Sequence, residues 1–227
     1  MKLLSINVAK PKNITYKGKQ VLTGIYKNPT QSPLMLRTLN LDGDKQADLE
    51  AHGGIYKAVY VYSIENYNYW KQKLNRDDFN YGQFGENFTV EGMTDNVIYV
   101  GDRFQVGDAI VEVTQPRVPC YKLAFKMNRP DFVKLFLRSG RTGFYLKVIQ
   151  EGEVNIADTF NKINNGPEQM TVQEINHLLY FDKKNIQMAR KALKIPALSP
   201  GWKGSFQDMV EKQDAAILPP QDCGSGC

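Results

Sequence analysis

A cysteine in a proline-rich stretch near the middle of the chain has neighbours that favour a reactive thiol. Cys120 follows Pro116 and Pro119, and each proline biases the residue before it toward extended backbone, so the sulfur is presented from a stiff segment. Arg117 and Lys122 flank it, and nearby cations stabilise a thiolate, which is either a nucleophile or a ligand for a soft metal. From spacing alone, a buried cysteine that acts as a small apolar residue is an equally good interpretation.

A histidine followed by paired glycines forms a second candidate site. His52 precedes Gly53 and Gly54, and Lys57 comes shortly after them. Paired glycines let the backbone approach a ligand closely or adopt a positive φ. A turn between two strands, with a hydrogen-bonded histidine, is the structural alternative.

Two further glycine-flanked segments carry polar groups that suit a cofactor. Gly85 and Asn87 lie ahead of a predicted strand, where backbone donors and an amide could match the alternating donors and acceptors of a pterin ring. Arg141 and Thr142 lie between two glycines and could clamp a phosphate. Both patterns also occur without a ligand, because Gly-x-x-Gly is common in turns and a glycine can stop a helix beside an exposed arginine.

Several other kinds of site are disfavoured. His52 and His177 are the two histidines, so a histidine metal cage is excluded, and His177 lies in an apolar helical pattern that indicates a structural role. The sequence contains no G-x-S-x-G elbow, no G-x-G-x-x-G after a strand and no Walker A motif. Hydrolase, dinucleotide and P-loop sites are therefore not indicated.

Composition predicts an ordinary globular protein. The chain has 227 residues, of which 42% are hydrophobic and 23% charged. No apolar run suits a signal peptide or a membrane span, so we expect a cytoplasmic protein with no membrane contact. Three cysteines argue against a disulfide framework, and Cys223 and Cys227 lie in a polar tail, where a metal site or disulfide is less favoured than a frayed end.

The net charge of +5 lies entirely in the first part of the chain. Residues 165–227 hold seven basic and seven acidic side chains, whereas residues 1–164 hold 22 basic and 17 acidic ones. A mild positive field of this kind suits an anionic small molecule. It is too weak, and too free of Lys/Arg runs, to indicate a nucleic-acid partner.

Short strands with closely spaced turn signals dominate the first 164 residues and predict a β-barrel core rather than alternating βαβ units. The predicted strands are 4–8, 21–26, 33–39, 58–62, 88–90, 97–100, 103–106, 109–114, 144–150 and 154–157, with the last two forming a hairpin. Ser63 is predicted to cap an amphipathic helix that reaches Leu74, and a shorter helix is expected over 131–138.

The pattern becomes helical after the turn at 164–167. Thr171 and Glu174 fit a capping box, Asp182 could cap a second helix that ends near Leu193, and Pro200 opens a third. We therefore expect an α+β protein with a barrel domain over 1–164, a small three-helix domain over 165–220 and a polar tail over 221–227. Three short helices are marginal alone, so we expect them to pack on the barrel or on a second copy, which makes a homodimer plausible.

Five motifs in order resemble those of a MOSC domain, the module at the C-terminus of molybdenum-cofactor sulfurases. They are His52-Gly-Gly54, Phe84-Gly-Glu-Asn87, Gly101-Asp102, Gln115-Pro-Arg-Val-Pro-Cys-Tyr-Lys-Leu123 and Gly140-Arg-Thr-Gly143. The resemblance covers residues 3–160, and the remainder is similar to the three-helix domain of the free-standing YiiM-like branch.

The resemblance implies a β-barrel fold that binds a molybdenum cofactor, with Cys120 as the protein ligand to the metal. It also implies reduction of N-hydroxylated compounds, such as hydroxylaminopurine base analogues, to amines, with electrons from a separate reductase. By position in the motifs, the residues expected to bind the cofactor are His52, Lys57, Gly85, Asn87, Arg117, Lys122 and Arg141.

Two other functions remain open from the sequence. A non-catalytic module could carry the cofactor, or a persulfide on Cys120, to another enzyme, as the sulfurase relatives suggest. A small barrel could also bind single-stranded nucleic acid on aromatic platforms such as Tyr60 and Tyr67, but core and helix-face roles fit those side chains better.

Overall fold

The structure is a computed structural model that describes residues 1–30, 33–47 and 53–217. The predictions made for His52, for Cys223 and Cys227, and for the tail 221–227 lie outside the described residues.

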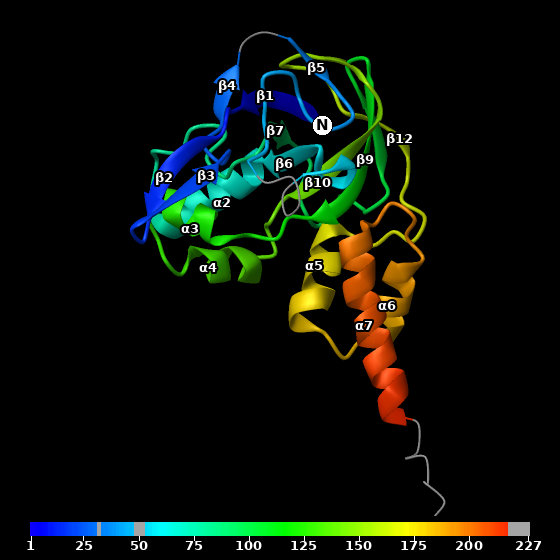
Figure 1. Ribbon diagram of the computed structural model, residues 1–227. Helices are drawn as coiled ribbons and strands as arrows, with labels where there is room; N and C mark the ends of the chain where they lie inside the picture. The colour runs from blue at the N-terminus through cyan, green and yellow to red at the C-terminus, as the bar shows by residue number, and fades with distance from the viewer. Residues whose placement is uncertain (31–32, 48–52, 218–227) are drawn as a thin grey trace, which may run out of the picture.

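One curled sheet of eight strands forms the centre of the molecule (Figure 1). Its spatial order is β12-β8-β9-β10-β6-β7-β1-β4, and neighbours are antiparallel except for β6 and β7, which run parallel. The strands are β1 (Lys2–Val8), β4 (Asn28–Thr30), β6 (Val59–Ser63), β7 (Phe88–Glu91), β8 (Arg103–Val106), β9 (Ala109–Pro116), β10 (Phe144–Gln150) and β12 (Asn161–Asn164).

The segment before β12 closes the curl against β1. Leu3 N donates to Asp158 O at 2.9 Å, and Phe160 N donates to Met1 O at 3.0 Å. The sheet therefore forms a half-barrel, which confirms the expected barrel-like core.

Strand β6 separates two hydrophobic cores. Side chains alternate across a strand, and here Val59 and Val61 enter the barrel core while Tyr60 and Tyr62 enter an aromatic core on the other face. All five residues of β6 are buried, as expected for a strand covered on both sides. The sequence pattern predicted this strand correctly.

Three short helices contribute side chains to the aromatic core on the outer face of β6: α2 (Ile64–Leu74), α3 (Tyr121–Lys126) and α4 (Phe132–Arg138). The chain also forms η1 (Ile55–Lys57) and a hairpin of β2 (Lys12–Tyr16) with β3 (Lys19–Thr23). Ser63 Oγ accepts from Asn66 N at 3.3 Å, so the predicted cap of α2 is confirmed. The α3 helix and the β2 strand were not predicted, because both segments are too short for a clear periodicity.

Two predicted strands differ from the structure. Residues 97–100 form turns with one isolated bridge, between Tyr99 and Thr171, rather than a strand. The predicted hairpin after β10 is also wrong, because β11 (Gly152–Val154) pairs with β5 (Leu34–Leu36) instead. An ideal Cβ on Gly152 would lie 2.3 Å from Asp108 C, so the chain crosses the β8–β9 turn closely and leaves β10.

Three C-terminal helices pack beneath the barrel (Figure 1): α5 (Val172–Phe181), α6 (Ile186–Leu193) and α7 (Pro200–Ile217). The capping box of Thr171 and Glu174 is present as predicted. Asn185 rather than Asp182 caps α6, with its side chain accepting from Met188 N at 3.2 Å.

The helices share the barrel's core. Ile175 and Leu178 of α5 belong to the same buried cluster as Val100 and Val113. Packing of the helices on the barrel and the α+β class are thus confirmed. Among the described helices, none is long and apolar enough to cross a bilayer.

Candidate functional site

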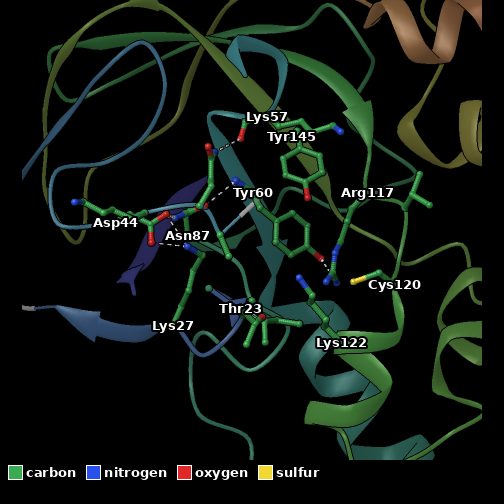
Figure 2. A pocket seen from close by; sticks show the side chains of 17 residues that line it. Thr23, Lys27, Asp44, Lys57, Tyr60, Asn87, Arg117, Cys120, Lys122 and Tyr145 are labelled. Atoms are coloured by element: carbon green, nitrogen blue, oxygen red, sulfur yellow. Dashed lines mark hydrogen bonds and ion pairs between the residues drawn. The ribbon is translucent and has the colours of Figure 1, made fainter. Parts of the chain in front are cut away.

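A cavity opens beside Cys120 between the half-barrel and the β2–β3 hairpin (Figure 2). It brings together six of the residues predicted from separate motifs: Lys57, Gly85, Asn87, Arg117, Lys122 and Cys120. Residues outside the predicted cofactor-binding set complete its wall, among them Lys27, Asp44, Tyr60 and Tyr145.

Cys120 lies at the junction between the proline-fixed segment and α3. It is the N-cap residue of that helix, with extended backbone at φ −121° and ψ 170°. Its thiol is half-buried, and Figure 2 shows the sulfur beside the guanidinium of Arg117. The extended segment and the following helical turn together set the direction of the thiol.

Arg117 is buried and partnered by aromatic groups. The side chain is 6% exposed, its Nη1 donates to Tyr60 Oη at 3.4 Å, and its guanidinium carbon lies 4.7 Å from the Tyr60 ring centroid. Among the residues that the structure describes, no carboxylate forms an ion pair with it. A buried cation without an anionic partner is costly, so an anion is expected to complete this site.

Electrostatics keep this guanidinium charged. Burial by itself lowers the pKa of Arg117. Tyr60, Tyr145 and Cys120 outweigh that effect, and the pKa lies above the ordinary arginine value. The charge of Arg117 is therefore permanent at the pH of any cell.

Strand register brings the two tyrosines to the arginine. Tyr145 pairs with Tyr60 across β10 and β6, and with Gln115 across β10 and β9. The rings of Tyr60 and Tyr145 lie 5.3 Å apart, and burial raises the pKa of both hydroxyls against the opposing effect of Arg117. No sequence signal could have identified this pair, because 85 residues separate them and only the sheet order makes them neighbours.

Asn87 lines the cavity, but its amide is engaged within the protein. Its Oδ1 accepts from Tyr60 N at 3.1 Å, and its Nδ2 donates to Asp44 Oδ2 at 2.8 Å and to Asn7 O at 3.3 Å. These bonds fasten β6 to the turn at Asp44. The amide therefore positions the wall, and the contact with a ring edge stays a prediction.

A buried ion pair that the sequence did not indicate lies next to this amide. Lys27 Nζ contacts Asp44 Oδ1 and Oδ2 at 2.5 and 2.6 Å, and both side chains are more than nine-tenths buried. Burial lowers the pKa of Lys27, and Asp44 opposes the shift. Asp44 Oδ1 also accepts from Ala9 N at 2.8 Å, so this carboxylate holds three segments together.

The Phe-Gly-Glu-Asn segment folds around its own carboxylate. Glu86 accepts from Gly82 N at 2.7 Å, from Phe84 N at 3.0 Å and from the Tyr67 hydroxyl. These backbone donors therefore point inward rather than toward a ligand. Gly85 remains at the cavity wall with φ +83°, where an ideal Cβ would lie 2.7 Å from Ile25 Cγ1, so the position requires glycine.

Lys126 is a further buried cation that supports the wall. Its Nζ donates to Gly82 O at 2.6 Å and to Ile25 O at 3.0 Å. Burial lowers its pKa to about 8, although Glu86 opposes the shift. This lysine joins α3 to the two loops on the opposite side of the cavity.

Arg141 does not line the Cys120 cavity. Its Nη1 donates to Asn66 Oδ1 at 3.0 Å, and its guanidinium carbon lies 4.7 Å from the Tyr69 ring centroid. The loop that contains it supports the cavity through backbone carbonyls instead, because Thr142 O accepts from the Tyr60 hydroxyl at 2.8 Å and Gly143 O accepts from Arg117 N at 3.0 Å. The expected phosphate clamp is thus not part of this wall.

The donor set fits a group that combines a soft metal with an anion. The Cys120 thiol is a soft ligand, and the Arg117 fork suits phosphate or another planar oxyanion. Lys57 and Lys122 add half-buried cations at the same wall. Among the described residues the buried Arg117 has no carboxylate partner, which suits an anionic group at this wall.

Comparisons with known proteins identify the family of this chain. The MOSC domain family matches residues 48–161, and the YiiM-like, 3-alpha helix domain matches residues 170–213. The uncharacterized protein YflK of Bacillus subtilis (strain 168) is 42% identical over 96% of both chains, and protein YiiM of Escherichia coli (strain K12) is 33% identical over 82% of this chain and 83% of its own. A protein named "Reductase" from Gibberella moniliformis is 26% identical over 79% of this chain and 32% of its own.

A solved structure extends the match to three dimensions. The crystal structure of YiiM from Geobacillus stearothermophilus superposes with a TM-score of 0.79 at 33% identity, over 92% of this chain and 98% of that one. The shared fold spans both the half-barrel and the C-terminal helices. The chain therefore belongs to the MOSC-domain family and carries the YiiM-like three-helix region after its MOSC domain.

Proposed function

We propose that the protein binds a molybdenum cofactor in the Cys120 cavity and reduces N-hydroxylated compounds to amines. The observation that carries the proposal is the half-buried thiol of Cys120 beside the buried Arg117, whose positive charge has no carboxylate partner among the described residues. The thiolate would bind the metal, and the guanidinium would bind the anionic part of the cofactor.

The other residues of the wall have separate tasks. Lys57 and Lys122 would add attraction for the pterin and its phosphate. Asn87, Asp44 and Lys27 would hold the wall in shape through their buried hydrogen bonds. The site is thereby organised before any ligand arrives, which reduces the ordering cost of binding.

The reaction consumes two electrons and two protons and converts R–NHOH to R–NH2 and water. The cofactor would supply this two-electron chemistry when bound, and the protein would bind and orient it. Electrons would come from a separate reductase protein. The fungal relative named "Reductase", of which this chain matches about a third, supports the reductive direction.

Metal analysis of protein made in a host that synthesises the cofactor tests the proposal. Wild type is expected to retain molybdenum, Cys120→Ala and Cys120→Ser to lose it, and Val97→Ala, at an exposed residue that does not line the cavity, to retain it. Equal molybdenum in wild type and Cys120→Ala, or none in either, would contradict metal binding by this thiol. Assay with hydroxylaminopurine and an artificial electron donor then tests turnover separately.

The same preparations distinguish an enzyme from a carrier. A stable persulfide on Cys120, detected by mass spectrometry in protein without turnover, would replace the enzyme with a sulfur-carrier function. Bound molybdenum with reduction of the N–OH group supports the enzyme.

A further inference from the structure

The β2–β3 hairpin and α3 form one continuous surface beside the Cys120 cavity (Figure 1). Tyr16 of the hairpin packs against two rings of α3, with centroid distances of 4.8 Å to Tyr121 and 5.6 Å to Phe125. Lys122 Nζ donates to Leu22 O of the hairpin at 3.1 Å, and Lys122 also lines the cavity. This surface, the hairpin–α3 face, comprises residues 12–23 and 118–126.

Every charged side chain of the hairpin–α3 face is a lysine. They are Lys12, Lys17 and Lys19 on the hairpin and Lys122 and Lys126 on the helix, and neither segment contains Asp or Glu. The three hairpin lysines are exposed, and no salt bridge among the described residues involves them. The face therefore presents a positive field that no acidic side chain of its own neutralises.

Strand register directs two of these lysines to the side where the hairpin meets α3. Lys19 pairs with Tyr16 across the two strands, so their side chains share a face of the hairpin. Lys12 lies at an even spacing from Tyr16 along β2 and shares that face too. The positive charge is thus gathered around the rings that join the hairpin to the helix.

Exposed apolar side chains lie among the lysines. Leu22 is 46% exposed, Val118 45%, Tyr121 42% and Phe125 38%. Such residues are ordinary when scattered singly, but several gathered beside one cavity mark an interaction surface. An apolar centre with a charged rim is the composition of a patch that binds another protein.

The arrangement of the rings favours a protein over single-stranded nucleic acid. Tyr16 is tilted by 34° against Tyr121 and lies at 89° to Phe125, so the three rings pack on one another. Single-strand binding needs ring faces on which successive bases can stack. Rings that are already engaged with each other suit contact with apolar side chains instead.

We propose that the hairpin–α3 face docks the electron donor of the enzyme, an acidic electron-transfer protein whose redox group lies at its surface. The inference rests on the proposed function, whose reaction converts R–NHOH, two electrons and two protons to R–NH2 and water. The reduced partner would supply the electrons and become oxidised, and the protons would come from solvent. What the face adds is the position of the donor and the sign of its charge.

Two physical requirements place the donor here. Electrons tunnel efficiently only over short distances, so the donor has to dock on a surface that reaches the cavity, and Val118 and Lys122 belong to both. Attraction between opposite charges steers the encounter, and a small apolar centre lets the partner leave after it has delivered its electrons.

Binding of oxidised flavodoxin, an acidic protein with an exposed flavin edge, tests the face in the full-length protein with and without cofactor. Wild type is expected to bind flavodoxin and not cytochrome c, which is basic. Lys12→Glu/Lys19→Glu should weaken flavodoxin binding about ten-fold or more at low salt, and the difference should vanish at about 0.5 M salt. Phe125→Ala should weaken it about three-fold at both salt concentrations, because salt does not screen an apolar contact.

Lys183→Glu/Lys184→Glu is the matched control. These two exposed lysines lie between α5 and α6, away from the hairpin (Figure 1), and the variant changes the net charge by the same amount. It is expected to bind flavodoxin as wild type does, and thermal unfolding checks that every variant is folded. The inference is overturned if wild type does not bind flavodoxin, if Lys12→Glu/Lys19→Glu binds it equally well, or if both double variants weaken it equally.

Oligothymidylate and vesicles that contain phosphatidylserine test the other anionic partners. Both should bind more weakly than flavodoxin at the same salt concentration. If either binds more tightly, and Lys12→Glu/Lys19→Glu loses that binding, the face serves a nucleic acid or a membrane and the assignment to a protein is wrong.

Turnover with two electron donors separates docking from the proposed function. Reduced methyl viologen is a small molecule that needs no docking face, so it should support equal reduction of hydroxylaminopurine in wild type and Lys12→Glu/Lys19→Glu. With reduced flavodoxin the variant should lose about ten-fold in kcat/KM for the donor. Equal rates with flavodoxin would overturn docking alone. No reduction with viologen, together with flavodoxin binding that only the lysine variant loses, would support the face and contradict the proposed function.

Discussion

The guanidinium of Arg117 lies over the ring of Tyr60, with 4.7 Å between the guanidinium carbon and the ring centroid. Tyr60 accepts from Arg117 Nη1 at 3.4 Å and donates its own proton to Thr142 O at 2.8 Å. The cation is thus oriented by a neutral partner that is itself anchored to the loop before β10. A neutral anchor leaves the positive charge available to an anion in the cavity.

Arg117→Met tests whether this cation serves binding rather than folding. The variant removes a buried charge without stranding a carboxylate, so we expect the free energy of unfolding of cofactor-free protein to fall by less than about 1 kcal/mol. Cofactor retention should fall at least about ten-fold, because a charge-assisted bond is lost. Denaturant titration and metal analysis measure the two effects. A destabilisation above about 3 kcal/mol would show that Arg117 is mainly structural.

The Lys27–Asp44 pair predicts strongly non-additive mutations. Asp44→Asn leaves the buried Lys27 without its anion and is expected to cost about 3–5 kcal/mol. The double variant Lys27→Met/Asp44→Asn should recover much of that loss, because no buried charge remains unpaired. A double-mutant cycle by urea unfolding measures the coupling. Additive effects would mean that the two side chains do not depend on each other.

The lowered pKa of Lys126 predicts that the free energy of unfolding rises in alkaline solution. Burial lowers its pKa to about 8 from an ordinary value of 10.5, so between these values the unfolded chain binds the proton that the folded chain has released. The free energy of unfolding should therefore increase between pH 8 and pH 10.5, with a slope of up to about 1.4 kcal/mol per pH unit. Below pH 8 the cost of burying the ammonium is fully present.

Unfolding curves of two variants across this pH range identify the group. Lys126→Met has no ammonium and Lys126→Arg has a cation that does not titrate there, so both should lose this increase relative to wild type. If either variant shows the same rise in the free energy of unfolding as the wild type, the effect belongs to another residue.

Two glycines at positive φ allow the cost of steric crowding to be measured apart from the cost of backbone strain. At Gly143 an added Cβ would lie 2.4 Å from Val61 O, whereas at Gly18, in the β2–β3 turn, it would meet no atom within 4 Å. Gly143→Ala is expected to cost about 3 kcal/mol or more, and Gly18→Ala about 1 kcal/mol, since strain alone acts there. Thermal unfolding compares them. Equal losses would show that the loop around Gly143 can move away from β6.

Local patterns predicted those elements that depend on neighbouring residues. Alternation identified β6, and the capping box identified the start of α5. The β2 strand and α3 escaped prediction because a few residues do not produce a readable period. The pairing of β11 with β5 escaped as well, because a sequence does not state which distant strand lies alongside.

The sequence by itself determined the chemistry that is available: one cysteine in a stiff segment, flanking cations, and motifs that resemble a MOSC domain. The tertiary structure decided which groups share the cavity. Strand register placed Tyr60 and Tyr145 on Arg117, the Asn87 amide became a structural bond, and Arg141 was directed to Asn66. The type of each side chain follows directly from the sequence. Which side chains contact one another depends on pairings between segments that are far apart in the chain, and only the folded sheet sets those pairings.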